Sequence, residues 1–329
     1  MKLAVIGCTG LVGTVILKVI SECKLPISEL ILVASSKSIG KEIKFESNSL
    51  EIESIEMALS KNPEIAIFCA GGEISKKWAP IFSKNGITVI DNSSAWRMDH
   101  QVPLVVPEIN GNSIKKSNKI IANPNCSTIQ MVLALKEIHK RFIIDRIVVS
   151  TYQSVTGTGA AAVKQMMDER NEVESDKVYP HPIDKNCFPH GGDFLPNGYT
   201  TEEIKLLDET RKIFNSPEIK VTATVVRIPV IGGHSMAVNV NTKTPFKIEE
   251  IYDAFEATPG VIIKNDNLNF DYPMPLTAHE RNEVFVGRIR EDNTIENGLN
   301  MWIVADNLRK GAATNAVQIA EYLINNKLV

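Results

Sequence analysis

The feature that most constrains this 329-residue chain is a glycine-rich turn near its beginning. A short apolar run, residues 2–6, leads into Gly7-Cys8-Thr9-Gly10-Leu11-Val12-Gly13, and a helical pattern follows at once. Glycines at this spacing let the chain turn tightly, bring its backbone close to a pyrophosphate and pack the helix on the sheet. The helix N-terminus adds free N–H groups and a positive dipole end. This context predicts a dinucleotide site rather than a βα turn without a ligand.

Short apolar runs alternate with helical patterns over the first 125 residues. Runs rich in Val and Ile are typical of strands buried on both faces, and their alternation with helices predicts a Rossmann-type, doubly wound parallel sheet. The expected strands are Lys2–Ile6, Leu30–Ala34, Glu64–Phe68, Thr88–Ile90 and Lys119–Ala122, and the expected helices are Leu11–Ser21, Ser54–Leu59 and Ile74–Lys84.

The middle of the chain carries longer strand patterns with partial period-2 alternation, which predict a second α+β domain with a mixed sheet covered by helices on one face. Residues 175–200 predict a long irregular excursion, and a last helix over 307–325 is expected to return to the first domain. We therefore expect domains at 1–125 plus 306–329 and at 126–305. The expected strands are Arg146–Thr151, Lys220–Ile228, Met236–Asn241, Glu283–Ile289 and Asn300–Ala305, and the expected helices are Ala160–Asn171, Glu202–Phe214 and Ile248–Ala257.

The end of the second strand indicates which dinucleotide is bound. An NAD site usually carries Asp or Glu at this point, which binds the ribose 2′-hydroxyl. Here Ala34 is followed by Ser35-Ser36-Lys37-Ser38, which offers hydroxyls and a cation and no acid. We therefore predict NADP, with Ser36 and Lys37 at the 2′-phosphate. The alternative for Lys37 is a solvated surface lysine.

Cys126 begins a helical pattern after Asn123-Pro124-Asn125. The positive end of a helix dipole favours the thiolate form of a cysteine in the first turn. A thiolate beside a hydride carrier suits aldehyde or acyl chemistry through a thioester. A lone cysteine is more often a small buried hydrophobe, and structural roles fit the other four better. These are Cys8, Cys23, Cys69 and Cys187.

The thiolate needs a proton partner, and His234 has the most suggestive setting among six histidines. It follows Gly232-Gly233 between two strand patterns, where the backbone has conformational freedom, and imidazole suits acid–base work. His139, late in the Cys126 helix, is expected to be a solvated cation. For His181 and His190, in the irregular segment, a surface position is an equally good interpretation.

Composition excludes several classes of protein. The net charge of −3 gives no reason to invoke nucleic acid. Neither a secretory signal nor an apolar run of about 18 residues is present, so no membrane association is expected. Five cysteines without short paired spacing argue against a disulfide framework and a zinc ribbon, and no metal-ligand cluster is apparent. We expect a reducing cytoplasm.

Taken together, these motifs resemble the aspartate-β-semialdehyde dehydrogenase family over essentially the whole chain. Each motif is weak alone, but their order and spacing are specific. Besides the glycine turn and Ala34–Ser38, they are Cys69-Ala70-Gly71-Gly72, Asp91-Asn92-Ser93-Ser94-Ala95-Trp96-Arg97, Val106-Pro107-Glu108-Ile109-Asn110, Asn123-Pro124-Asn125-Cys126-Ser127-Thr128, Tyr152-Gln153-Ser154-Val155-Thr156-Gly157-Thr158-Gly159 and Gly232-Gly233-His234-Ser235.

The resemblance implies reduction of L-aspartyl-β-phosphate by NADPH to L-aspartate-β-semialdehyde, with release of phosphate, in the biosynthesis of lysine, threonine, methionine and diaminopimelate. It implies that Cys126 forms the thioester, that His234 is the general acid/base and that Gln153 orients the acyl group. Arg227 would bind the substrate α-carboxylate, a task suited to guanidinium.

The resemblance also implies the remaining contacts. Arg97 and Lys205 would bind phosphate, Glu202 the substrate amine, and Asn125 the substrate. Without the resemblance, Glu202 and Lys205 would be taken as a surface ion pair. The alternative for Arg97 is a surface arginine on a loop, but the flanking donors of Asn92-Ser93-Ser94 favour an anion site. The implied cofactor contacts are Gly7, Thr9, Gly10, Leu11, Val12, Gly13, Ser36, Lys37, Ala70, Gly71, Thr156, Gly157 and, at the nicotinamide, Asn307.

Two departures and two rivals accompany this assignment. Lys37 stands where the family often has Arg, and Cys8 where Ala is common. An N-acetyl-γ-glutamyl-phosphate reductase shares the fold and the cysteine, but that family usually has Gly before the cysteine and an aromatic after it, unlike Asn125 and Ser127. A non-catalytic NADP-binding regulator is the rival of another class. The resemblance suggests a homodimer or a dimer of dimers.

Overall fold

The computed structural model describes residues 1–174 and 176–329 and divides into two compact units. The first comprises residues 1–125 and 312–329, and the second comprises residues 126–311. The return of the chain to the first unit thus begins at Ala312, and residues 306–311 belong to the second unit. Ser175, within the excursion expected over 175–200, lies outside the described residues.

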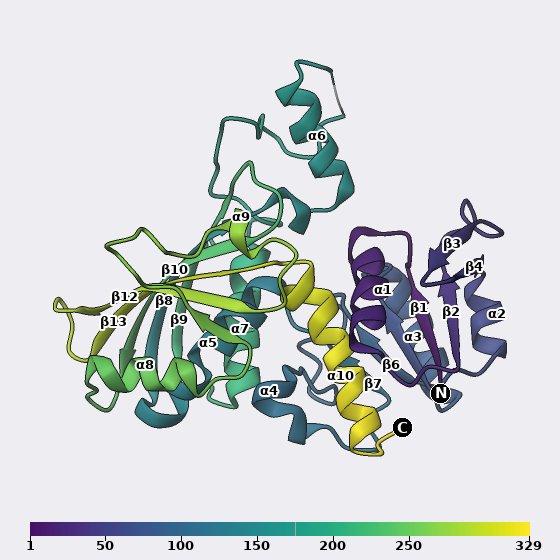
Figure 1. Cartoon of the computed structure of the whole chain (residues 1–329), viewed down its shortest axis with the longest axis horizontal. Helices are drawn as coiled ribbons and strands as arrows, with labels where there is room; N and C mark the ends of the chain where they lie inside the picture. Colours follow the sequence, from purple (N-terminus) through teal and green to yellow (C-terminus); the bar gives the residue numbers. More distant parts are fainter. Residues whose placement is uncertain (175) are drawn as a thin grey trace. The chain divides into compact units, whose positions relative to one another are not determined.

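The first unit contains a sheet in the order β3-β4-β2-β1-β5-β6-β7, parallel except for the β3–β4 pair (Figure 1). The order reverses direction at β1, so the strand ends of β2, β1 and β5 flank the switch point where such sheets bind ligands. The strands are β1 (Lys2–Ile6), β2 (Glu29–Val33), β3 (Glu42–Phe45), β4 (Asn48–Glu53), β5 (Ile65–Phe68), β6 (Thr88–Asp91) and β7 (Ile120–Ala122).

Helices cover both faces of this sheet because its strands are apolar on both sides. Leu3 and Val5 of β1 pack in a cluster with α1 (Leu11–Cys23) and α10 (Thr314–Asn325). Their neighbours Ala4 and Ile6 pack in the opposite cluster, with α2 (Ile55–Ser60) and α3 (Gly72–Lys84). This alternation confirms the doubly wound sheet that the sequence predicts.

Three local features differ from the expectations. Residues 42–53 form the β3–β4 hairpin, whose exposed, charged strands carry little apolar signal. A short helix, α4 (Pro107–Asn110), and a 3₁₀ turn, Gly111–Ser113, follow β6. The single helix expected over 307–325 is instead a π-helical turn, Arg309–Ala313, continued by α10.

The second unit contains a mixed sheet in the order β11-β12-β13-β10-β8-β9. Pairs β8–β9 and β11–β12 are parallel, and the remaining pairs are antiparallel. This confirms the predicted mixed sheet. The strands are β8 (Ile144–Gln153), β9 (Lys220–Arg227), β10 (His234–Thr242), β11 (Val261–Ile263), β12 (Val284–Asp292) and β13 (Gly298–Ala305).

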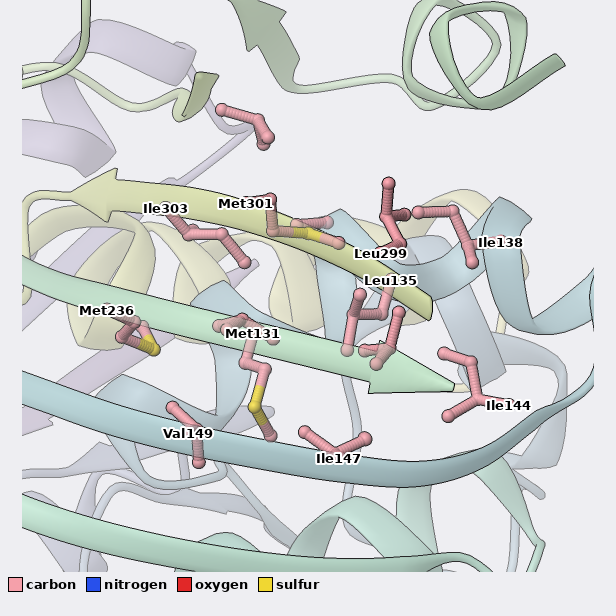
Figure 2. Packing of buried hydrophobic residues seen from close by; sticks show 14 of the residues in the cluster. Met131, Leu135, Ile138, Ile144, Ile147, Val149, Met236, Leu299, Met301 and Ile303 are labelled. Carbon is pink, nitrogen blue, oxygen red and sulfur yellow. The ribbon is translucent and has the colours of Figure 1, made fainter. Parts of the chain in front are cut away.

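Three helices cover one face of this sheet: α5 (Cys126–Phe142), α7 (Thr201–Phe214) and α8 (Ile248–Glu256). Figure 2 shows Met131, Leu135 and Ile138 of α5 packed against inward-facing side chains of β8, β10 and β13. Burial of these apolar side chains stabilises the unit by removing their surface from water. The helix α6 (Ala160–Arg170) lies away from this layer, and α9 (Pro275–Ala278) is a single turn (Figure 1).

The described helices are either too short or too polar to cross a membrane. Over the same residues, His, Cys, Asp and Glu side chains form no group of three or more able to hold a metal ion.

Candidate active site

Four strand ends of the second unit meet at one edge of its sheet. Arg227 ends β9 and pairs in register with Gln153, which ends the parallel strand β8. His234 begins the antiparallel strand β10 and pairs with Ala305, the last residue of β13. The alternation of strand directions therefore brings Gln153, Arg227 and His234 to the same edge, with Asn307 two residues beyond β13.

Cys126, half-buried, is the first residue of α5, and hydrogen bonds tie that end of the helix to the same edge. The Gln153 Nε2 donates to Ser127 Oγ at 2.9 Å. One turn along α5, Gln130 Nε2 donates to the Ala305 carbonyl at 3.2 Å. Gly311 lies so close that a Cβ there would stand 3.0 Å from the Cβ of Cys126. The structure thus brings the predicted nucleophile to the strand ends that carry its predicted partners.

The buried His234 imidazole has a defined tautomer. The backbone N–H of Ser154 donates to Nδ1 at 3.0 Å, so the neutral ring carries its proton on Nε2. Among the described residues, Nε2 has no hydrogen-bond partner. Burial lowers the pKa of His234 to about 3; the Arg227 guanidinium acts in the same direction, and Glu202 opposes it. The resting imidazole is therefore neutral and presents an N–H donor.

Arg227 is buried beside His234, and Gly157 provides the space for both. A Cβ on Gly157 would lie 3.0 Å from His234 Nε2 and 3.2 Å from Arg227 Nη1. The Nη1 of Arg227 donates to the Ser154 carbonyl at 2.8 Å, while its Nε has no partner within the described part of the chain. Gly157, predicted as a cofactor contact, lies against these two side chains.

Glu202 and Lys205 form an ion pair of 2.8 Å on the first turns of α7. Thr200 and Glu203 cap that helix reciprocally, and Glu203 also accepts the Val225 N–H at 3.0 Å, which ties α7 to β9. Gly191 packs against the Glu202 side chain, where a Cβ would stand 3.3 Å from the Cβ of Glu202. Packing, rather than surface ion pairing alone, thus fixes Glu202.

Asn307 is held by a hydrogen bond that the sequence does not reveal. Thr156 Oγ1 lies 3.0 Å from Asn307 Oδ1 and 2.7 Å from Ser154 Oγ. The preceding residue, Asp306, accepts the Leu308 and Arg309 N–H groups at 2.8 and 3.2 Å. The sequence analysis assigns no role to Ser154 or Asp306. An Asp two and three residues before N–H donors is nevertheless a typical capping pattern.

The first unit holds a cavity of about 570 Å³ over the ends of β1, β2 and β5. Gly7 has φ +98°, and a Cβ there would stand 2.9 Å from the backbone of Cys69 and Ala70. A Cβ on Gly13 would stand 2.2 Å from the Gly7 carbonyl oxygen. Both glycines therefore serve close packing of the turn, as a dinucleotide cradle requires.

The predicted cofactor contacts of the first unit divide into those that line this cavity and those that do not. Leu11, Val12 and Gly13 form the first turn of α1, and Gly71 caps α3 with φ +91°. Lys37 is exposed and lies outside the cavity lining. The predicted contacts that line it are Gly7, Thr9, Gly10, Ser36 and Ala70.

Arg97 is buried in the first unit, with 8% of its surface exposed, so it is no surface arginine. Its Nε donates to the Asn123 carbonyl at 2.9 Å, and its Nη2 donates to the Asn92 carbonyl at 2.8 Å. Asn125, also buried, ends the first stretch of this unit.

The remaining cysteines differ from Cys126 in setting. Burial raises the pKa of Cys8 to about 11 and that of Cys69 to about 12, with the Cys69 thiol turned toward the Ile6 carbonyl at 3.1 Å. Both thiols therefore stay protonated and inert. Cys23 and Cys187 are exposed.

The prediction for His139 is wrong. Its ring is half-buried, stacks on Phe214 of α7 and accepts the Ile144 N–H at 3.2 Å. Burial lowers the pKa of His139, so the ring is a neutral packing element rather than a solvated cation. His181 is exposed, and the half-buried His190 stacks on Phe194.

Comparison with known proteins identifies the family to which the chain belongs. Residues 2–117 match the model of the semialdehyde dehydrogenase NAD binding domain, and residues 135–310 match that of the semialdehyde dehydrogenase dimerisation domain. The aspartate-semialdehyde dehydrogenase of Aquifex aeolicus is 50% identical over 100% of this chain and 99% of that protein. The structure of aspartate semialdehyde dehydrogenase II from Vibrio cholerae complexed with ASA superposes with a TM-score of 0.94 at 44% identity, covering 99% of this chain and 98% of that one. The chain therefore belongs to the aspartate-semialdehyde dehydrogenase family of oxidoreductases.

Proposed function

We propose that this chain reduces L-aspartyl-β-phosphate to L-aspartate-β-semialdehyde with NADPH and releases inorganic phosphate, as a step of amino-acid biosynthesis. The observation that carries the proposal is the tie between the Cys126 end of α5 and the strand ends that bear Gln153, Arg227 and His234. The 50% identical relative and the ASA complex of the Vibrio cholerae protein support this substrate.

Cys126 is the proposed nucleophile. Its sulfur attacks the acyl carbon of the substrate, the C–O bond to the phosphate breaks, and a thioester forms. The helix N-terminus of α5 favours the attacking thiolate. The amide of Gln153, held by Ser127, would orient the acyl group. NADPH, when bound, would supply the hydride that reduces the thioester. The resulting thiohemiacetal releases the aldehyde and restores the Cys126 thiolate.

His234 acts first as a donor in this scheme. Because Nδ1 accepts the Ser154 N–H, only Nε2 faces the chemistry, and it carries a proton in the neutral ring. That proton is available to the oxygen on which negative charge develops at the acyl carbon. When the thiohemiacetal collapses, the same nitrogen takes the proton back.

Arg227 and Glu202 are proposed to recognise the two charged groups of the amino acid. The Nη1 of Arg227 is used by the Ser154 carbonyl, which leaves Nε and the remaining guanidinium N–H groups for the substrate α-carboxylate. Glu202, paired with Lys205, suits the substrate ammonium, and Lys205 suits phosphate. Arg97 remains the second proposed phosphate cation, and Asn125 a proposed substrate contact.

The cavity of the first unit fits a dinucleotide because two glycines allow the tight turn that such a site requires, since a Cβ on either glycine would collide with protein backbone. We propose NADP as the cofactor, with Ser36 and Lys37 at the 2′-phosphate and Gly7, Thr9, Gly10, Leu11, Val12 and Gly13 around the pyrophosphate. Ala70, Gly71, Thr156, Gly157 and Asn307 complete the proposed contacts, with Asn307 at the nicotinamide.

The second unit matches a dimerisation domain, and the sheet face opposite its helices carries half-buried Tyr152 and Trp302, whose rings lie 5.4 Å apart. We propose that this face joins two copies into a homodimer, alone or within a dimer of dimers. The proposed location is a reducing cytoplasm, in which the Cys126 thiol persists.

The test is formation of NADPH from L-aspartate-β-semialdehyde, phosphate and NADP. Cys126→Ala is expected to lose at least about 10⁴-fold in kcat, since the nucleophile is removed, while Cys187→Ala, at an exposed thiol, serves as the matched control. An acyl adduct on Cys126 should appear by mass spectrometry during turnover. A fully active Cys126→Ala variant would exclude Cys126 as the nucleophile. A preference for N-acetylglutamate semialdehyde over L-aspartate-β-semialdehyde would overturn the proposed substrate.

A further inference from the structure

The helix α6 holds the segment that follows it through two side chains. Each of these side chains accepts two backbone N–H groups at 2.7 and 2.9 Å. The pairs are Val178 and Tyr179 with Gln165 Oε1, and Ile183 and Asp184 with Glu169 Oε2. A segment without a regular strand or helix over 176–188 thus has its backbone fixed at four points.

The two accepting side chains also fix each other. Gln165, 1% exposed, donates from Nε2 to Glu169 Oε1 at 2.7 Å, so its Oε1 must face the segment. Burial alone would raise the pKa of Glu169, but hydrogen bonds from the Asp184 N–H, the Gln165 amide and the Ile183 N–H outweigh it and hold that pKa below its ordinary value. Glu169 is therefore a charged acceptor at neutral pH, and such hydrogen bonds are stronger than neutral ones.

Gln165 and Glu169 together form a clamp on this segment. The clamped backbone carries Tyr179. Its ring, 7% exposed, lies over the Arg227 guanidinium, with 5.9 Å between Cζ and the ring centroid. Its hydroxyl donates to Thr158 Oγ1 at 2.7 Å, and the ring packs edge-on against Phe188 at 5.3 Å. Phe188 in turn exchanges backbone hydrogen bonds with Arg227, at 3.2 Å and 2.9 Å. The segment contacts Arg227 at both its backbone and its side chain.

Arg227 needs this support because the described residues provide its guanidinium with a hydrogen bond at Nη1 and none at Nε. A planar cation with one anchored corner can pivot, and a bidentate carboxylate contact requires a fixed plane. An aromatic face against the guanidinium restrains that plane, excludes water and attracts the charge. The contact with the ring uses none of the N–H donors of the Arg227 guanidinium.

We propose that Tyr179 is a positioning residue of the substrate α-carboxylate site, whose ring, clamped by Gln165 and Glu169, fixes the guanidinium plane of Arg227. The proposal rests on the proposed role of Arg227 in binding that carboxylate. The proposal gives the segment 176–188 a function: this segment holds the side chain that packs against the Arg227 guanidinium.

The test compares Tyr179→Leu with Tyr179→Phe, which keeps the ring and loses only the hydroxyl. Two aldehydes are used: L-aspartate-β-semialdehyde and 3-aminopropanal, which lacks the α-carboxylate. For Tyr179→Leu we expect KM for the semialdehyde to rise about tenfold, with KM for NADP unchanged and kcat/KM for 3-aminopropanal unchanged. For Tyr179→Phe we expect both aldehydes to remain within about twofold of the parent.

Controls separate positioning from folding. Met166→Leu alters a buried residue of the same apolar cluster, conserves volume and should leave both substrates unaffected. If Tyr179→Leu does not fold, Glu169→Gln replaces it; this change weakens the clamp and should raise KM for the semialdehyde in the same direction by about threefold. Equal losses on both aldehydes in either variant would overturn the positioning role.

Arg227→Lys distinguishes the two proposals. If Arg227→Lys raises KM for the semialdehyde at least tenfold and Tyr179→Leu does not, Tyr179 has no positioning role while the function of Arg227 stands. If Arg227→Lys leaves that KM unchanged, the carboxylate role of Arg227 fails, and the Tyr179 proposal fails with it. Raised KM in both single variants, with no further rise in the double variant, is the expected result.

Discussion

The two units build their sites by opposite means. In the first, the cavity over β1, β2 and β5 depends on missing side chains, because a Cβ at Gly7 or Gly13 would collide with backbone. In the second, the site depends on buried polar side chains, such as His234 and Arg227, each anchored by one hydrogen bond to Ser154. The comparison indicates that the cavity of the first unit tolerates little added side-chain volume, whereas the candidate active site of the second unit tolerates little rotation of its buried side chains.

The largest effect expected from this comparison is that of Gly157→Ala. The new methyl group would stand 3.0 Å from His234 Nε2 and 3.2 Å from Arg227 Nη1, so both side chains must move by a few tenths of an ångström. A displacement of about 1 Å in a reacting site costs about 100-fold in kcat, which is the upper bound for this smaller shift. In steady-state kinetics we expect kcat to fall by about tenfold or more, up to that bound, with a stable fold by thermal unfolding. Gly72→Ala, whose added methyl would meet no atom within 4 Å, is the matched control.

A Gly157→Ala enzyme with parental kcat would show that the second site tolerates movement of its side chains, and the contrast between the units would disappear. A selective rise in KM for NADP would instead show that the proposed cofactor contact of Gly157 matters more than its packing against His234 and Arg227.

The contrast also explains what the sequence predicts and what it does not. The glycine turn and Cys126 are recognisable because strand, turn and helix start lie within a few residues. The pairing of Gln153 with Arg227, and of His234 with Ala305, depends on strand register between distant segments. Sequence patterns mark the strands, but they do not fix which ends meet.

Two errors have different causes. His139 has the position of a helix C-terminal cation, but stacking on Phe214 from α7 buries it, so a neighbour from elsewhere in the fold overrides the local preference. The β3–β4 hairpin is missed because its strands are mostly polar and exposed or half-exposed, and its turn at Glu46 has φ +53° without glycine. The hairpin therefore lacks the local signals by which a sequence reveals one.

A smaller effect distinguishes two glycines of the first site. Gly13→Ala would place a methyl group 2.2 Å from the Gly7 carbonyl oxygen, whereas Gly10→Ala would place one at 3.5 Å, an ordinary contact. We expect Gly13→Ala to raise KM for NADP about tenfold and to destabilise the fold by about 1–3 kcal/mol. Gly10→Ala should be milder on both measures, read by kinetics and chemical denaturation. Equal behaviour of the two variants would mean that the turn adjusts freely.

The smallest effect tests whether the first site also uses a side-chain charge. Lys37 is exposed and lies outside the cavity lining, so its attraction to a 2′-phosphate is screened by water and salt. Exposed ion pairs contribute about 0.2–1 kcal/mol, which predicts a fall of at most about fivefold in the ratio of kcat/KM for NADPH to that for NADH in Lys37→Ala. The fall should become smaller as salt is added, because salt screens the attraction between Lys37 and the 2′-phosphate in the parent enzyme. An unchanged ratio at low salt would leave Ser36 and the backbone as the 2′-phosphate site, and this unit would then bind its ligand almost wholly through main-chain groups and short hydroxyls.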